Sequence, residues 1–262
     1  MKWLRIRTVV RRNLYVLWRA PNRWFDIAVW PLFDVLLFGS LGAFVAQEND
    51  ISRAGTPYLL AGIMLFHVLF QSQIGVATGF MEETWSRNLL NLMTTPLTEV
   101  EYAAGLALYS ALKTVLAMAA ISVAALIFFG FGLNEVGWAL VPVVGLLLLV
   151  GFAVALFNIG LLLRFGQSAE ILAWGLNFVM LALSGVFNPV SALPGAVEPV
   201  ARVLPTTYVF SAARQVLDGE PLPWADLARG AAGAVVVTAL AFWFVVHMLA
   251  TFRRRGYVTR FS

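Results

Sequence analysis

The sequence predicts an all-α membrane protein with six transmembrane helices. Of its 262 residues, 60% are hydrophobic and only 12% are charged, whereas soluble domains carry roughly 25% charged residues. Two further observations support this fold class. Six apolar runs each reach or nearly reach the roughly 20 residues that cross a hydrocarbon core, and the basic residues gather at both ends of the chain.

The expected spans form one transmembrane domain that covers residues 1–262. The spans are residues 24–46, 58–80, 102–129, 137–163, 169–187 and 227–252. Seven of the 18 Lys and Arg lie in residues 1–23 and four in 253–260, which is typical of ends beside an anionic cytoplasmic leaflet. Two ends on one side require an even number of spans, and six satisfies this. We therefore expect both termini to be cytoplasmic.

The composition argues against several classes of function. Cysteine is absent, and His67 and His247 are the only histidines, so disulfides and metal clusters built on Cys or His are not expected. The motifs H-E-x-x-H and G-x-S-x-G are also absent, which gives an intramembrane enzyme little support. The net charge of +4 comes from the basic ends and does not indicate nucleic acid as a partner.

The first 22 residues predict an amphipathic helix at the membrane interface. Apolar residues recur at spacings of three and four, and arginines recur every seven on another face. The apolar set is Trp3, Ile6, Val10, Leu14 and Leu17, and the basic set is Arg5, Arg12 and Arg19. Pro21 is expected to end this helix. Two roles stay open: a surface anchor, or a helix that also packs on a cytoplasmic partner.

A second amphipathic helix is expected between the second and third spans. Trp85, Leu89, Leu92 and Met93 fall on one face, and Glu82, Glu83 and Arg87 lie elsewhere. Pro96 stops this helix, and Thr98 with Glu101 then predicts a capping box that opens the third span. Such a helix either floats at the interface or forms the contact with a soluble motor.

The proline-rich segment after the fifth span predicts two short helices. Pro189 and Pro194 break the span, and Pro205 separates helical stretches near 194–203 and 206–217. Neither stretch is long enough to cross the membrane. Their apolar content favours re-entry into the membrane, or burial among headgroups, over a plain surface loop.

These segments resemble the permease subunits of type-2 ABC exporters, which are bacterial pumps driven by ATP hydrolysis. The inner run EETWSRNLLNLMTTPL has an acidic pair, an Arg, leucines and Thr-Pro that are similar to the family pattern. The outer run LSGVFNPVSALP…LPTTYVFSAARQVLDG is the more specific match. The resemblance covers essentially the whole chain. Trp85-Ser86 departs from the short polar or Gly-containing stretch of many relatives, which suggests a different fit to the partner's groove.

The resemblance implies a coupling helix at 82–95 and a re-entrant outer hairpin at 188–219. The coupling residues would be Glu82, Glu83, Trp85, Arg87, Leu89 and Leu92. The outer gate would be formed by Pro189, Pro194, Pro205 and Arg214.

The resemblance also implies a homodimer in the bacterial plasma membrane that recruits ATPase subunits. This chain has no G-x-x-x-x-G-K-[ST] loop, so ATP and Mg²⁺ are expected on the ATPase partner and no cofactor on this chain. The predominance of apolar spans and the short outer loops favour an amphipathic cargo: a drug-like molecule, a lipid or a lipid-linked glycan.

Polar residues inside the expected spans carry the remaining predictions. Asp34 and Lys113 lie at similar depth, where a charge costs about 2.5–3.5 kcal/mol on insertion scales, so we expect them to pair. Two alternatives are an anionic cargo group bound by Lys113, and an ion-coupled transporter that uses Asp34 and Lys113 as a relay. For His67, Asn158 and Asn177 we expect hydrogen bonds between helices.

Overall fold

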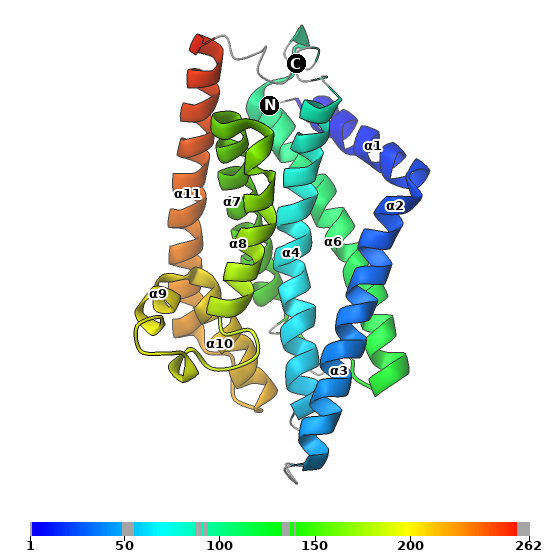
Figure 1. Ribbon diagram of the computed structural model, residues 1–262, viewed down its shortest axis with the longest axis vertical. Coiled ribbons are helices and arrows are strands. Elements are labelled where there is room, and N and C mark those ends of the chain that lie inside the picture. Colours follow the sequence, from blue (N-terminus) through cyan, green and yellow to red (C-terminus); the bar gives the residue numbers. More distant parts are fainter. Residues whose placement is uncertain are drawn as a thin grey trace.

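The computed structural model describes residues 2–48, 55–86, 88, 91, 94–132, 137–138 and 140–255. Within these residues the chain is built from helices and their connections (Figure 1). Five of the described helices are long and apolar enough to cross a membrane. They are α3 (Trp30–Glu48) with the π-helical turn Phe25–Val29 that leads into it, α4 (Gly55–Trp85), α6 (Glu99–Phe129), α7 (Leu140–Phe165) and α11 (Trp224–Arg255).

The N-terminal segment forms the predicted amphipathic helix. α1 (Trp3–Arg19) buries Ile6, Val10 and Leu17, largely against α6, whereas Trp3 is exposed. The backbone is extended at Ala20, and Pro21 begins the short helix α2 (Pro21–Trp24), as the fixed φ of proline favours. α1 therefore lies on the bundle end where α6 begins.

We call this end of the bundle the basic end. It comprises α1, the last turn of α4, the first turn of α6 and the last turn of α11. Figure 1 shows that α1 and the end of α11 lie at the same end of the bundle, which confirms that the two ends of the chain's helical part share one side.

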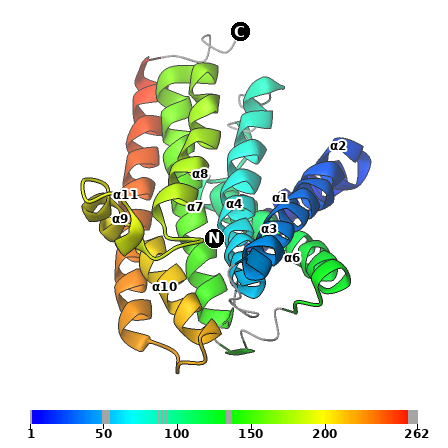
Figure 2. The same ribbon diagram turned by 60° about the horizontal axis from the view of Figure 1, so that its bottom comes forward.

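α4 is the central helix of the bundle. In its most apolar stretch 89% of the residues are buried, against 17% in α11. Figures 1 and 2 place α4 between α3 and α6 on one side and α7 and α8 on the other, and α4 packs against all four. The polar side chains of α4 are therefore inside the bundle.

α4 also runs further than the predicted second span. It continues unbroken to Trp85, so Glu82 and Glu83 belong to its last turn and not to a separate helix. Residues 81–85 contain neither Pro nor Gly, and the two carboxylates find basic partners there. Of the predicted apolar face, Leu89, Leu92 and Met93 lie outside the described residues.

The predicted fifth span forms a helix that is too short to cross the membrane. α8 (Glu170–Leu183) follows a 3₁₀ turn at Gly166–Ala169 and has 14 residues, or about 21 Å, against a hydrocarbon core of about 30 Å. It ends at Ser184 because Gly185 turns the chain with a φ of 68°. Six complete spans are therefore not confirmed, and five helices of spanning length are described.

The proline-rich segment completes the path that α8 begins. A 3₁₀ turn at Val190–Ala192 is followed by α9 (Glu198–Val203) and α10 (Pro205–Leu217), so the two predicted short helices are present, with Pro205 as the first residue of the second. α10 packs against α7 and α11 and buries Val209 and Phe210. Figure 1 shows these helices beside the bundle's lower half, within its length.

Candidate functional site

Ion pairs hold α1 against the basic end of α4 and α6. Each pair joins an arginine of the N-terminal segment to a glutamate of the bundle. The pairs are Arg5–Glu101, Arg12–Glu83 and Arg23–Glu82. Because the glutamates come from two helices, the N-terminal segment links the end of α4 to the start of α6.

Glu83 is the most enclosed part of this link on α4. It is only 3% exposed, and its carboxylate accepts a 2.7 Å hydrogen bond from the Asn88 side chain as well as the Arg12 ion pair. The hydrogen bond to Glu83 is the main cause that raises the pKa of the Arg12 guanidinium. Loss of Arg12 would leave the buried Glu83 carboxylate without its ion pair, so this contact constrains the last turn of α4.

Glu101 plays the matching part on α6. Its carboxylate accepts a 2.8 Å hydrogen bond from the backbone N–H of Lys2 and a 3.2 Å bond from that of Thr98. The Thr98 hydroxyl accepts in turn from the backbone N–H of Glu101, so the predicted capping box is confirmed. One glutamate both caps α6 and holds the start of α1.

Asp34 and Lys113 each have a polar partner, but neither partner is the one that the sequence predicts. His67 Nε2 of α4 lies 2.8 Å from Asp34 Oδ2 of α3, and the Lys113 ammonium of α6 pairs with Asp26 of the π-helical turn. The predicted Asp34–Lys113 pair is therefore wrong. The chain travels along α1 and α2 before it descends, so Asp26, and not Asp34, reaches the depth of Lys113.

The central part of α4 makes further polar contacts with its neighbours. Gln71 donates a 3.1 Å hydrogen bond to the Asp26 carbonyl, and Asn177 of α8 donates to the Gln73 side chain. The predicted interhelical bonds of His67 and Asn177 are confirmed. Neither side-chain polar atom of buried Asn158 has a partner within the described part of the chain.

Aromatic rings flank these polar groups on the face between α3 and α8. Phe70 of α4 lies 5.9 Å from the His67 ring and 6.0 Å from that of Trp174 on α8. Large apolar side chains project outward from α3 and α8. They are Phe33, Leu37, Leu41 and Phe44 on α3, and Ile171, Phe178 and Val179 on α8. This α3–α8 face therefore combines apolar surface with the half-buried Asp34 carboxylate.

An arginine holds the outer hairpin to the end of α8. Arg214 of α10 donates a hydrogen bond to the backbone carbonyl of Gly185 at the sharp turn. Beside it, the Ser184 and Thr206 hydroxyls lie 2.6 Å apart and both residues are fully buried. α10 is thus fixed to α8 as well as to α7 and α11.

Comparison with known proteins assigns this arrangement to a family. A family model described as ABC-2 type transporter matches residues 5–217, from α1 to the end of α10. The chain belongs to the ABC-2 transporter family. No curated protein matches the sequence. The family is a membrane component of ABC transporters, so the chain is a multi-pass transport permease whose relatives associate with ABC ATPases.

In this ABC-2 permease the predicted coupling residues separate into two groups. Glu82 and Glu83 face the N-terminal segment through their ion pairs, whereas the Trp85 side chain is 47% exposed at the end of α4. The others, Arg87, Leu89 and Leu92, lie outside the described residues. Their role in coupling stays a prediction.

The four predicted outer-gate residues all lie between the end of α8 and the end of α10. Pro189 precedes the 3₁₀ turn, Pro194 follows it and Pro205 begins α10. The Arg214 side chain makes a long-range hydrogen bond, to the Gly185 carbonyl.

The sequence analysis did not predict three residues that make polar contacts between helices inside the bundle: Asp26, Gln71 and Gln73. Asp26 could have been predicted from the sequence, because it is an acidic residue two positions inside the first expected span. Gln71 and Gln73 could also have been predicted from the sequence. Two amide side chains this close together inside one span are costly in lipid unless they face other helices.

Proposed function

We propose that this ABC-2 permease is the transmembrane subunit of an exporter driven by ATP hydrolysis on separate ATPase subunits. The observation that carries the proposal is the basic end, where ion pairs join α1, α4 and α6 next to the exposed Trp85. A force applied to Trp85 would reach the central helix α4 directly. ATP and Mg²⁺ would bind the partner, because these 262 residues contain no Walker-type loop.

The test separates coupling from folding. Trp85→Ser should leave membrane insertion intact and uncouple the partner's ATP hydrolysis from export, because aromatic anchors commonly carry the energy of an interface. The measurement compares ATPase stimulation and cargo export in vesicles that contain both subunits. Trp138→Ser is the matched control, since Trp138 is 90% exposed between α6 and α7. Normal export by Trp85→Ser would contradict the proposal.

The working unit is a homodimer that joins through the α3–α8 face. The Asp34 side chain is 33% exposed there, and ionisable groups at membrane depth face protein or a water-filled cavity and not lipid. A second copy that covers this face would enclose Asp34, Phe70 and Trp174 along a shared route. Such a route has both polar and aromatic groups, which fits an amphipathic cargo.

Cysteine cross-linking tests this dimer without background, because the chain has no cysteine. Asp34 lies at the depth of His67 and Trp174 near that of Phe70. At about 1.5 Å per residue, Leu37 and Phe178 then lie within one turn of the same depth. The double variant Leu37→Cys/Phe178→Cys should form disulfide-linked dimers on mild oxidation in membranes.

The matched control places cysteines on the opposite helices. Val115 and Val235 are as exposed as the test pair, on α6 and α11, and the variant Val115→Cys/Val235→Cys should stay monomeric. Cross-linking of the control pair alone would assign the dimer to the other face.

The outer hairpin, with α9 and α10, would close the far end of this route. Its support is the Arg214–Gly185 contact, which ties α10 to the turn where α8 stops short of the far surface. With the basic end in the cytoplasm of a bacterial cell, cargo would leave past this hairpin.

A further inference from the structure

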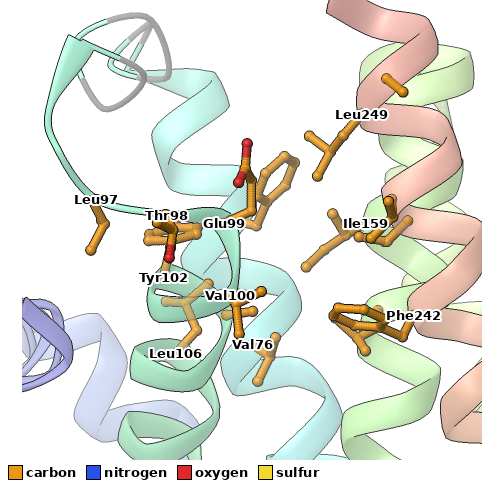
Figure 3. Close-up of a pocket in the computed structure, with 16 residues that line it drawn as sticks. Val76, Leu97, Thr98, Glu99, Val100, Tyr102, Leu106, Ile159, Phe242 and Leu249 are labelled. Atoms are coloured by element: carbon orange, nitrogen blue, oxygen red, sulfur yellow. The ribbon is translucent and has the colours of Figure 1, made fainter. Parts of the chain in front are cut away.

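A lateral cavity of about 410 Å³ opens in the half of the bundle next to the basic end. α6 and α11 form its two walls, and α4 and α7 form its floor. Figure 3 shows side chains from both walls turned toward the space between them, including Leu106 from α6 and Phe242 and Leu249 from α11. The cavity lies away from the α3–α8 face.

The walls of this cavity reach the membrane, whereas its floor does not. On the walls, Val100, Phe242 and Val246 are 40–47% exposed. On the floor, Val76 and Leu156 are each 1% exposed. The volume lies within the roughly 300–1,000 Å³ of small-molecule pockets, and an apolar cavity of this kind excludes water and accepts apolar groups.

The lining changes character along its length. The polar members Thr98 and Glu99 come from the start of α6, at the basic end, and Leu106 lies about 10 Å deeper on the same helix. On α11 the lining runs from Phe242 to Ala250, about 12 Å. A molecule that fits has an apolar chain pointing to the membrane centre and a polar group at the surface.

The sequence places positive charge just beyond the cavity. α11 continues as a helix beyond the cavity to Arg255, and its last three residues are the basic residues Arg253, Arg254 and Arg255. A cationic position one turn above an apolar cavity suits a phosphate headgroup.

From these observations we infer that the cavity binds one acyl chain of a phospholipid from the leaflet at the basic end, with the lipid phosphate next to the end of α11. The lipid fills the gap between α6 and α11. This inference does not depend on the proposed export function, since it concerns the membrane and this chain alone.

Photolabelling of the full chain tests the site. The chain is reconstituted in nanodiscs of phosphatidylethanolamine and phosphatidylglycerol with a trace of phospholipid that carries a diazirine in its acyl chain. After photolysis, adducts are mapped by mass spectrometry. We expect adducts on the floor residues Val76 and Leu156, although both are shielded from bulk lipid. Labelling confined to outward-facing residues such as Trp243 would overturn the inference.

Two filling variants and a control complete the design. Ala103→Phe and Ala250→Phe each narrow the cavity from one wall and should abolish the floor adducts while Trp243 labelling persists. Ala250 is exposed, so its variant folds even if Ala103→Phe does not. Ala119→Phe, at an exposed position elsewhere on α6, should leave the floor adducts unchanged. Floor adducts that survive in Ala250→Phe would refute the site.

Discussion

The buried Lys113 side chain is paired with the Asp26 carboxylate. Its side chain is 6% exposed, and the Asp26 carboxylate that neutralises it is 25% exposed. The Asp26 carbonyl also accepts a hydrogen bond from Gln71, so this residue joins α4 and α6. Both contacts depend on the position of the π-helical turn relative to α6.

A double-mutant cycle tests this pair. Lys113→Met and Asp26→Asn should each lower the thermal stability of the purified protein, because removing one partner of a buried pair costs about 3–5 kcal/mol. The double variant should recover most of the loss. Asp34→Asn combined with Lys113→Met is the control and should give no recovery, since those residues do not pair. Recovery in the control would restore the pairing predicted from sequence.

The wrong prediction of an Asp34–Lys113 pair shows the limit of estimating depth by counting residues along a span. Counting residues from the start of each span placed Asp34 and Lys113 level, but the count assumed that both helices start at one surface. The extra length of α1, α2 and the π-helical turn shifts the first span relative to α6. By contrast, the Thr98–Glu101 capping box was predictable because its signal is local.

Glycine permits the close approach of α4 and α7. A Cβ on Gly151 of α7 would lie 2.7 Å from the Leu69 carbonyl and would overlap the Ser72 hydroxyl. Contact with backbone cannot be relieved by a change of rotamer. Small residues at such crossings let membrane helices pack closely.

Two alanine substitutions on α7 test this contact. Gly151→Ala should separate α4 from α7 and reduce folded yield, with a cost of about 1–3 kcal/mol typical of overpacking. Gly145→Ala is the matched control, because no atom lies within 4 Å of its added Cβ. Size-exclusion profiles and melting temperatures in detergent compare the two. Equal behaviour of the variants would mean that the α4–α7 contact is loose.

At the scale of elements, prediction succeeded where a helix had a clear stop signal. Pro21 and Pro205 marked helix boundaries correctly, and five spans match helices of spanning length. The run at 169–187 is mostly apolar, yet Gly185 reverses the chain after α8. Hydropathy measures transfer to lipid and not the path of the backbone, so an apolar helix that turns before it has crossed looks like a span.

Across the whole described chain, the helical path begins and ends at the basic end despite the short α8. α8 enters from the basic end, α9 and α10 lie toward the far end, and α11 returns to the basic end. α8 and the hairpin together thus lead the chain from the basic end toward the far end. The charge bias at the two ends agrees with this path, because both ends belong to one surface.

Single introduced cysteines test the orientation. Gly195→Cys, in the exposed turn before α9, should react with an impermeant thiol reagent added to intact cells. Arg11→Cys, exposed on α1, should react only after the membrane is opened. The opposite pattern would reverse the orientation, and labelling of both from outside would contradict the placement of α1 and the outer hairpin on opposite surfaces.

The central position of α4 also has a consequence for how the protein is made. α4 is synthesised early, but three of the helices that cover it, α6, α7 and α8, follow it in the chain. Until they emerge, Gln73 lacks its contacts with Ala173 and Asn177 of α8, and the sides of α4 that will face α6 and α7 are uncovered. Polar groups in that position are costly against lipid. The nascent chain therefore passes through an interval in which its future centre is its most exposed part, and a chain that stops after α4 would be a substrate for membrane quality control.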